Sequence, residues 1–315
     1  MTFKTIIAVA AATALALFPA AAKDMTYKVV SPDGHLSATV TVGQSVSYSV
    51  SRDGVNLIDA SQISMTLADG IVFGENDKVR KVKKTSVDQT LSTVAYKKAQ
   101  VRDNYNEITL IFKEFSLAFR AYDEGVAYRF TSSLKNDSKV LAEKAQFNFA
   151  KDWDAYVPYV NQHIETLESQ YWNSFENTYS IHALSRWNKK RLAFLPVAVS
   201  AEGGMKVLVT ESDLVNYPGM YLYNEGDATT LTGRFAPYPK TVEQGGHNML
   251  QGVVKDREDF IASCTAGESF PWRIIMVSTN DAELAVNDMV WKLGEPADPS
   301  VDYSWVKPGK VAWDW

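Results

Sequence analysis

The feature that most constrains the fold is a series of short runs in which apolar and polar residues alternate, each ended by a turn. Such runs follow one another from Met25 to about Ile275 at roughly even spacing. One of them covers residues 115–122, turns at Asp123-Glu124-Gly125 and continues through residues 126–130. A period of two is typical of half-buried strands, and many strands joined by turns indicate antiparallel sheets. We therefore predict a mainly β fold, a large sandwich of antiparallel sheets.

Composition limits what stabilises this sandwich and what it binds. Cys264 is the only cysteine among 315 residues, so no internal disulfide is available and the apolar core must hold the fold. Hydrophobic residues make up 46% of the chain, which is ample for such a core. The formal net charge is -5, and no basic stripe stands out. The chain therefore does not have the charge pattern of a nucleic-acid-binding protein.

The first 22 residues have the pattern of a secretory signal peptide. Lys4 precedes an apolar run from Ile6 to Phe18, and small residues follow at positions 20–22. The run is shorter than the roughly 20 residues that a membrane-spanning helix needs, although a permanent anchor is the alternative interpretation. We predict cleavage after Ala22, export to the periplasm and no attachment to the membrane afterwards.

The pattern changes near the carboxyl end. Asn280 and Asp281 can begin a helix whose apolar positions extend to Leu293, before Gly294 ends it. We predict a signal peptide at 1–22, a β-sandwich domain at 23–280, a linker with a helix at 281–304 and a new domain beginning at 305–315. Because the last residues have the pattern of a strand without partners, we expect the chain to be part of a longer protein.

Two long segments resemble family 97 of the glycoside hydrolases. They are residues 209–222, VTESDLVNYPGMYL, and residues 305–315, WVKPGKVAWDW. Residues 121–130 and 174–179 support the resemblance, which extends over nearly the whole chain after the signal peptide. The resemblance implies three parts: an amino-terminal, galactose-mutarotase-like β-super-sandwich, a central (β/α)8 barrel and a carboxy-terminal β domain.

The same resemblance implies an enzyme that acts on α-glucosides or α-galactosides with bound calcium. Its catalytic carboxylates lie on the barrel, at the carboxyl ends of the strands. A glycosidase needs two carboxyl groups beside the scissile bond, so a chain that holds only the first strand of the barrel lacks both. We therefore expect a non-catalytic amino-terminal domain with no catalytic residue of its own, whose partners are its own barrel and an α-linked oligosaccharide or glycoside.

The resemblance also implies that this domain contributes a glutamate to the calcium site, and Glu211 is the best match. The turn Tyr217-Pro218-Gly219-Met220 would hold the Glu211 loop, with Gly219 at positive φ. Calcium takes six to eight oxygens, so one glutamate predicts weak binding or none in this chain alone. The alternative is that Glu211 is a carboxylate at a strand end in solvent.

Residues 155–188 are rich in aromatic and polar side chains and lack sustained alternation, which predicts long loops. Aromatic faces stack on sugar rings while amides and carboxylates bond the hydroxyl groups, so Trp172, Glu176 and Asn177 are the substrate-binding candidates. The same aromatic residues could instead pack in a core or an interface. No metal or nucleophile motif marks a separate active site in this region.

Two functions from different classes fit these observations. The first is the non-catalytic domain of an exported α-glycoside hydrolase. The second is a stand-alone periplasmic module for carbohydrate binding or assembly. The large apolar groups at 311–315 favour the first, because an independent domain would expose them.

Overall fold

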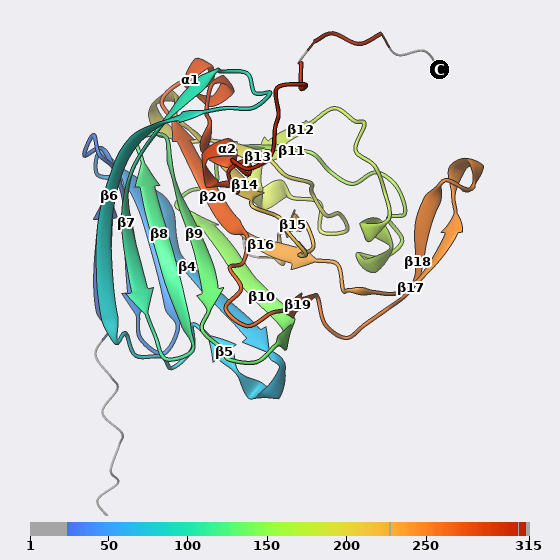
Figure 1. Ribbon diagram of the computed structural model, residues 1–315, viewed down its shortest axis with the longest axis horizontal. Coiled ribbons are helices and arrows are strands. Elements are labelled where there is room, and N and C mark those ends of the chain that lie inside the picture. The colour runs from blue at the N-terminus through green and yellow to red at the C-terminus, as the bar shows by residue number, and fades with distance from the viewer. Residues whose placement is uncertain (1–23, 227, 308, 313–315) are drawn as a thin grey trace, which may run out of the picture.

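The fold is a sandwich of two antiparallel sheets, each of nine strands, which confirms the predicted class (Figure 1). The structure is a computed structural model, and it describes residues 24–226, 228–307 and 309–312. The predicted signal peptide at 1–22 lies outside the described residues and stays a prediction. Residues 313–315 of the predicted last strand also lie outside the described residues. Val311 and Ala312, which are described, have no regular structure.

The first sheet is built mainly from the amino-terminal strands. Its strands are β1 (Met25–Val30), β2 (Leu36–Val42), β3 (Val46–Arg52), β4 (Val55–Leu67), β10 (Ser138–Phe149), β16 (Thr230–Phe235) and β15 (Met220–Tyr223), in that spatial order, with β5 (Val72–Phe73) beside β4 and β19 (Ala262–Cys264) beside β10. The strands β1 to β4 pair with their neighbours in the chain, as the predicted hairpins require.

The second sheet combines the middle of the chain with one late strand. In spatial order it contains β12 (Ser180–Ala183), β11 (Asp154–Val157), β13 (Val197–Ser200), β14 (Lys206–Ser212), β20 (Trp272–Ser278), β9 (Gly125–Ser132), β8 (Phe115–Tyr122), β7 (Gln100–Ile111) and β6 (Lys81–Ser92). The late strand β20 lies between β14 and β9 and closes the centre of this sheet. Short 3-10 turns occur at Ala68–Gly70, Glu168–Tyr171, Leu184–Arg186, Glu202–Gly204 and His247–Met249.

The core lies between the sheets, where the alternating apolar positions of both sheets meet. Tyr48 of the first sheet packs against Phe119 and Tyr128 of the second, with ring centroids 5.7 and 5.3 Å away. All three side chains are buried. The Tyr48 hydroxyl donates a hydrogen bond of 2.9 Å to the Gln146 carbonyl, so its polar end is also satisfied. Alternation along each strand thus selects which face is buried.

The second sheet carries a smaller apolar cluster on its outer face, beneath two short helices. These are α1 (Asp281–Ala285) and α2 (Met289–Leu293), in place of the single helix that the sequence predicted. Asn280 begins α1 as predicted, because its side chain accepts a hydrogen bond from the Glu283 amide. Met289 approaches β9 so closely that a Cβ at Gly125 would lie 2.4 Å from its sulfur. Glycine at 125 therefore lets α2 dock on the sheet.

A two-stranded ribbon projects from the sandwich. It consists of β17 (Pro239–Gly245) and β18 (Gln251–Arg257), which pair only with each other (Figure 1). In the view of Figure 1 the ribbon and residues 298–307 extend on the same side of the molecule. Among the described residues, no helix has the length and apolar character to cross a membrane.

The core makes a direct prediction about stability. Phe119→Ala should lower the free energy of unfolding by about 3–5 kcal/mol, because it removes a ring from the space between the sheets and leaves a cavity. Val82→Ala on the exposed face of β6 should change it by about 0.5 kcal/mol or less. Urea unfolding of this chain measures both, and equal effects would contradict the position of the core.

Candidate functional site

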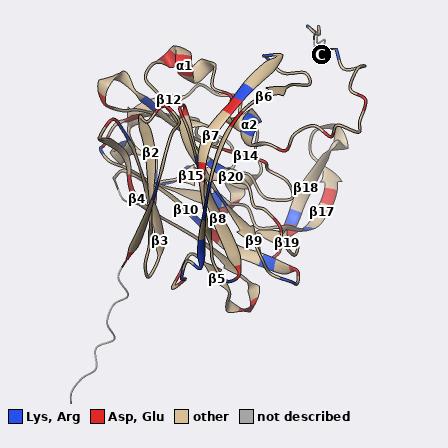
Figure 2. Cartoon of the chain, turned by 60° about the vertical axis from the view of Figure 1, so that its left-hand side comes forward, with Lys and Arg blue, Asp and Glu red and all other residues tan. Residues whose placement is uncertain are grey.

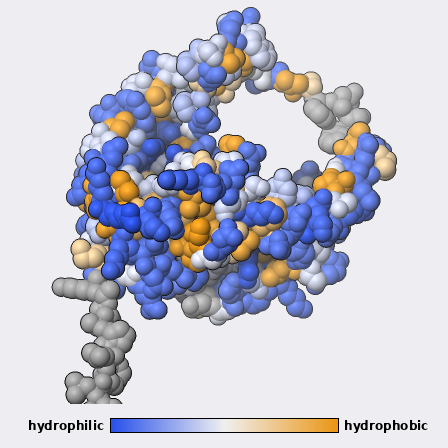
Figure 3. Space-filling view, turned by 60° about the horizontal axis from the view of Figure 1, so that its bottom comes forward, coloured by the Kyte–Doolittle hydropathy of each residue, from blue (hydrophilic) through white to orange (hydrophobic). Residues whose placement is uncertain are grey.

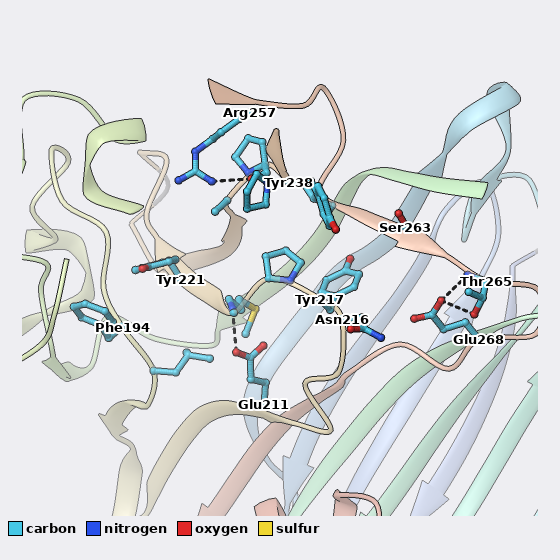
Figure 4. A pocket seen from close by; sticks show the side chains of 18 residues that line it. Phe194, Glu211, Asn216, Tyr217, Tyr221, Tyr238, Arg257, Ser263, Thr265 and Glu268 are labelled. Atoms are coloured by element: carbon cyan, nitrogen blue, oxygen red, sulfur yellow. Dashed lines mark hydrogen bonds between the residues drawn. The ribbon is translucent and has the colours of Figure 1, made fainter. Parts of the chain in front are cut away.

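A pocket of about 720 Å³ lies where the turn after β14 faces the base of the β17–β18 ribbon (Figure 4). Phe194 and Tyr221 form an aromatic wall at one end, and Asn216 and Glu268 lie toward the other. The remaining wall contains Leu195, Glu211 and residues 217–220, 236–239, 257, 261, 263 and 265. Aromatic walls with a few polar groups are typical of small-molecule sites, so this pocket is the candidate site.

The chain reaches the pocket through a tight turn after β14. Asp213 and Asn216 adopt positive φ values of 58° and 52°, which reverse the chain toward β15. The sequence predicted positive φ at Gly219, and that was wrong: the turn is made earlier, by residue types that tolerate the left-handed region. The predicted role of the turn is confirmed, since the Met220 amide donates a 2.9 Å hydrogen bond to Glu211 Oε1.

Beneath the pocket wall, a buried guanidinium joins two carboxylates. Arg273 of β20 donates from Nε and Nη2 to the two oxygens of Glu143 on β10, over 2.7 and 2.6 Å. Its Nη1 donates to Glu211 Oε2 on β14 over 2.5 Å. Tyr217 in the turn donates its hydroxyl proton to Glu143 over 2.7 Å. We call these four residues the Arg273 cluster.

The cluster holds one cation and two carboxylates away from water. The side chains of Arg273 and Glu143 are 2% and 3% exposed, and that of Glu211 is 13% exposed. Burial raises the pKa of Glu211 above its ordinary value, although Arg273 and the Met220 amide oppose the rise. Burial disfavours the charged form of Arg273, whereas the carboxylates of Glu143 and Glu211 favour it. The carboxylates prevail, so the pKa of Arg273 is raised. Glu211 is therefore the member of the cluster whose charge is the least well compensated.

Three of the residues predicted for the site lie outside the pocket. Trp172, Glu176 and Asn177 are exposed on the loop between β11 and β12, and none of them lines the cavity. Trp172 stacks on His163, with ring centroids 4.5 Å apart and ring planes inclined by 17°. Glu211 is the predicted residue that does reach the pocket wall.

A chain of aromatic rings connects this loop to the pocket. Tyr171 lies 5.5 Å from Tyr221 between ring centroids, and Phe175 lies 5.2 Å from Phe194. Tyr221 and Phe194, which are 5.4 Å apart, both line the pocket. The loop that carries the sugar-binding candidates is thus packed on the pocket's aromatic wall through its intervening residues.

The sequence reasoning missed Glu143 and Arg273. Arg273 had a signal, because it interrupts the apolar run of β20 and a charged residue in such a run needs a buried partner. Glu143 had none, because its strand has many polar residues and its partner follows 130 positions later.

The family of the chain follows from comparison with known proteins. Residues 29–296 match the family model described as Glycosyl-hydrolase 97 N-terminal. The chain belongs to glycoside hydrolase family 97. The match covers the sandwich and both helices.

Curated relatives of this family 97 chain are longer than the chain. A retaining alpha-galactosidase of Bacteroides thetaiotaomicron is 45% identical over 291 residues, which are 92% of this chain and 44% of that protein. A probable retaining alpha-galactosidase of Streptomyces bingchenggensis is 23% identical, over 98% of this chain and 44% of its own length. This chain therefore spans less than half the length of the curated relatives it matches.

Solved structures show the same fold. A family 97 enzyme from Pseudoalteromonas sp. strain K8 in complex with acarbose superposes with a TM-score of 0.70 at 22% identity, over 90% of this chain and 40% of that one. A beta-arabinopyranosidase superposes with a TM-score of 0.64 at 21% identity, over 81% and 40%. At these identities the likeness shows the fold of the family 97 domain.

Glu211 does not by itself fit a calcium ion. Its Oε2 accepts from Arg273, its Oε1 accepts from Met220, and a guanidinium repels a cation at the same carboxylate. In the parts of the chain that the structure describes, no three His, Cys, Asp or Glu side chains gather as a metal site. Calcium needs more oxygens than this wall of the pocket provides. The assignment of Glu211 as a ligand stays a prediction.

The geometry of the Arg273 cluster predicts unequal roles for its two carboxylates. Glu143→Gln should lower the free energy of unfolding by about 3–5 kcal/mol, because it removes the bidentate partner of a buried cation. Glu211→Gln, the matched neutral isostere, should cost about 1–2 kcal/mol, because it removes one hydrogen bond to a charged group. Urea unfolding of both variants of this chain measures the difference. A larger loss in the Glu211 variant would contradict the arrangement.

The raised pKa of Glu211 also predicts a pH dependence. Between the ordinary value of 4.5 and the raised folded value, the folded state binds the proton more tightly than the unfolded state. Stability from this group is therefore present at low pH and is lost as the pH rises through that window. The free energy of unfolding of the wild type, minus that of Glu211→Gln, should fall as the pH rises above 4.5. An increase of this difference above pH 4.5 would contradict the prediction, because it would show that Arg273 lowers the pKa of Glu211 by more than burial raises it.

Proposed function

We propose that this chain is the non-catalytic amino-terminal part of an exported α-glycoside hydrolase of the α-galactosidase or α-glucosidase type. In this proposal it packs against the catalytic part of the same protein and borders its substrate site. The observation that carries the proposal is the match to the Bacteroides thetaiotaomicron enzyme, which extends over 92% of this chain but only 44% of that alpha-galactosidase. The remaining length of such an enzyme is where the proposal places the chemistry.

The carboxylates of the pocket support a non-catalytic role. Hydrolysis needs one carboxyl group as an acid and a second as a base or nucleophile, both free to face the sugar. Glu211 is held by Arg273 and by the Met220 amide. Glu268 accepts hydrogen bonds of 2.6 and 3.0 Å from the amide and hydroxyl of Thr265. Both carboxylates therefore serve as supports for the backbone around the pocket.

The distribution of exposed apolar side chains supports a partner domain. Of the nineteen large hydrophobic residues exposed among the described residues, fifteen lie at position 164 or later. They belong to the loop after β11, to β12, to the turn after β14, to the β17–β18 ribbon and its base, and to the segment from Val286 onward. On the face drawn in Figure 3, apolar residues form small patches between hydrophilic ones. Exposed apolar side chains concentrated in the later part of the chain favour contacts of these segments with a partner.

The charge distribution supports a carbohydrate ligand over a polyanion. Figure 2 shows basic and acidic residues interspersed on the β17–β18 ribbon, where Lys240 pairs with Asp256 and Lys255 with Glu243. In the proposal Trp172, Glu176 and Asn177 border the sugar, where the exposed indole offers a stacking face and its neighbours offer polar groups. The complexes of the Pseudoalteromonas enzymes with acarbose and panose are consistent with a saccharide ligand in the family.

Calcium and export remain parts of the proposal that rest on the sequence. A calcium ion in the whole enzyme would take six to eight oxygen ligands, and the described part of this chain would supply few of them. Export rests on residues 1–22, and the periplasm is the compartment that the signal sequence favours.

Activity measurements test the proposal. The purified chain should not hydrolyse nitrophenyl α-galactoside or α-glucoside, because its pocket carboxylates are engaged in hydrogen bonds. The gene product that includes the catalytic part should hydrolyse at least one of them, and Trp172→Ala in that enzyme should raise KM by about tenfold through the loss of one stacking contact. Clear turnover by the chain alone would contradict the proposal.

The stand-alone binding module is the second candidate, and the exposed Trp172–His163 stack favours it. Calorimetric titration of this chain with melibiose or maltooligosaccharides separates the two. Heat that disappears in Trp172→Ala would support an independent binding site. No heat at millimolar sugar would leave the first proposal in place.

A further inference from the structure

We propose that the β17–β18 ribbon is a docking arm whose tip, Met249 and Leu250, inserts into an apolar recess on the catalytic part of the same polypeptide. This inference rests on the proposed function, since it requires a catalytic part. It adds a surface that neither the family match nor the predicted site residues identify.

The arm has no core of its own. Every residue of β17 from Pro239 to Gln244 is exposed, and β18 is exposed or half-buried throughout. Leu250 is 80% exposed, Met249 58% and Val242 55%. An isolated two-stranded hairpin is at best marginally stable in water and needs a surface to pack against. The most exposed apolar pair of the arm lies at its end, where a partner would meet it.

The tip is a defined turn and not an open loop. Gly246, Asn248 and Met249 have φ values of 66°, 51° and 58°. Backbone hydrogen bonds connect the Met249 amide to Gly246 and the Leu250 amide to His247, over 3.2 and 3.1 Å. A non-glycine residue such as Met249 rarely adopts positive φ, and such backbone is found where the surrounding structure or a function requires it. The turn thus presents two flexible apolar side chains on a fixed backbone.

The base of the arm is fixed to the sandwich at the rim of the pocket. Tyr238 stacks on Phe260 with ring centroids 5.2 Å apart. Arg257 donates 2.7 Å to the Pro237 carbonyl and forms a 3.1 Å ion pair with Glu168 of the loop after β11. Tyr238 and Arg257 also line the pocket. The arm is therefore continuous with the surface that the proposed function places against the catalytic part.

Three observations favour the catalytic part of the same chain as the occupant. The curated relatives have more than half of their length outside the matched region, which provides a partner domain. Residues 298–307 extend on the side of the arm in the view of Figure 1. The arm's charges are also balanced, since Lys240 faces Asp256 and Lys255 faces Glu243. Balanced charge does not attract a nucleic acid or an anionic membrane.

Hydrogen–deuterium exchange on the whole gene product, with its catalytic part, tests the arm. Peptides that cover residues 246–251 should exchange about tenfold more slowly in the whole enzyme than in this chain alone, because a covered turn opens less often. Met249→Ser with Leu250→Ser should abolish that protection in the whole enzyme. The matched control is Leu141→Ser, an exposed apolar residue on β10, which should leave it unchanged.

The outcomes separate this inference from the proposed function. An active enzyme whose arm exchanges as fast as in this chain would overturn the docking arm and leave the proposed function intact. Protection that appears only in a dimer, as shown by light scattering, would assign the arm to a second copy and also overturn the inference. A gene product without a catalytic part, or an inactive one, would overturn the proposed function and the inference together.

Discussion

The buried guanidinium of Arg273 is the interaction on which the arrangement of the pocket depends. It lies on β20, binds Glu143 of the opposite sheet through two hydrogen bonds and binds Glu211 of the adjacent strand through a third. Removing a partner from a buried ion pair is costly, because the charge left behind cannot be hydrated. Glu211 and Arg273 are register partners on the adjacent strands β14 and β20. The cluster thus couples the pairing of these two strands to the packing of β10 from the other sheet.

The cluster also determines what the pocket can do. Glu211 faces the cavity, yet its oxygens are used to orient Arg273 and to fix the turn at Met220. Tyr217 connects the same turn to Glu143. Because both oxygens of Glu211 accept hydrogen bonds, this carboxylate is suited to holding the pocket wall more than to proton transfer. This arrangement is in keeping with the non-catalytic role that we propose for the chain.

The early and late parts of the chain differ in how much apolar surface they expose. The strands β1 to β9 have their apolar side chains turned inward, and only a few large ones among them are exposed. The later loops and the β17–β18 ribbon expose many. Exposing apolar surface to water is unfavourable, so the concentration of exposed apolar side chains in the later part of the chain favours a contact with a partner there.

The sequence by itself determined the fold class and the family. Alternation in β8 and β9 predicts strands whatever their partners are, because the period of two is a local property of the backbone. The segments VTESDLVNYPGMYL and WVKPGKVAWDW carried the resemblance to family 97, and the family match confirmed it. The capping of α1 by Asn280 was likewise local and was predicted, whereas its break before α2 was not.

Only the tertiary structure decided which polar groups meet. Glu143 and Arg273 are 130 positions apart, and no spacing rule links two residues that come together when two sheets pack. For the same reason the resemblance to family 97 implied a metal-binding role for Glu211 without showing the guanidinium beside it. The residue types of the loop likewise made Trp172, Glu176 and Asn177 the sugar-binding candidates without showing that they lie outside the pocket. Local patterns encode the strands, and the pairing of charges depends on how those strands are brought together in space.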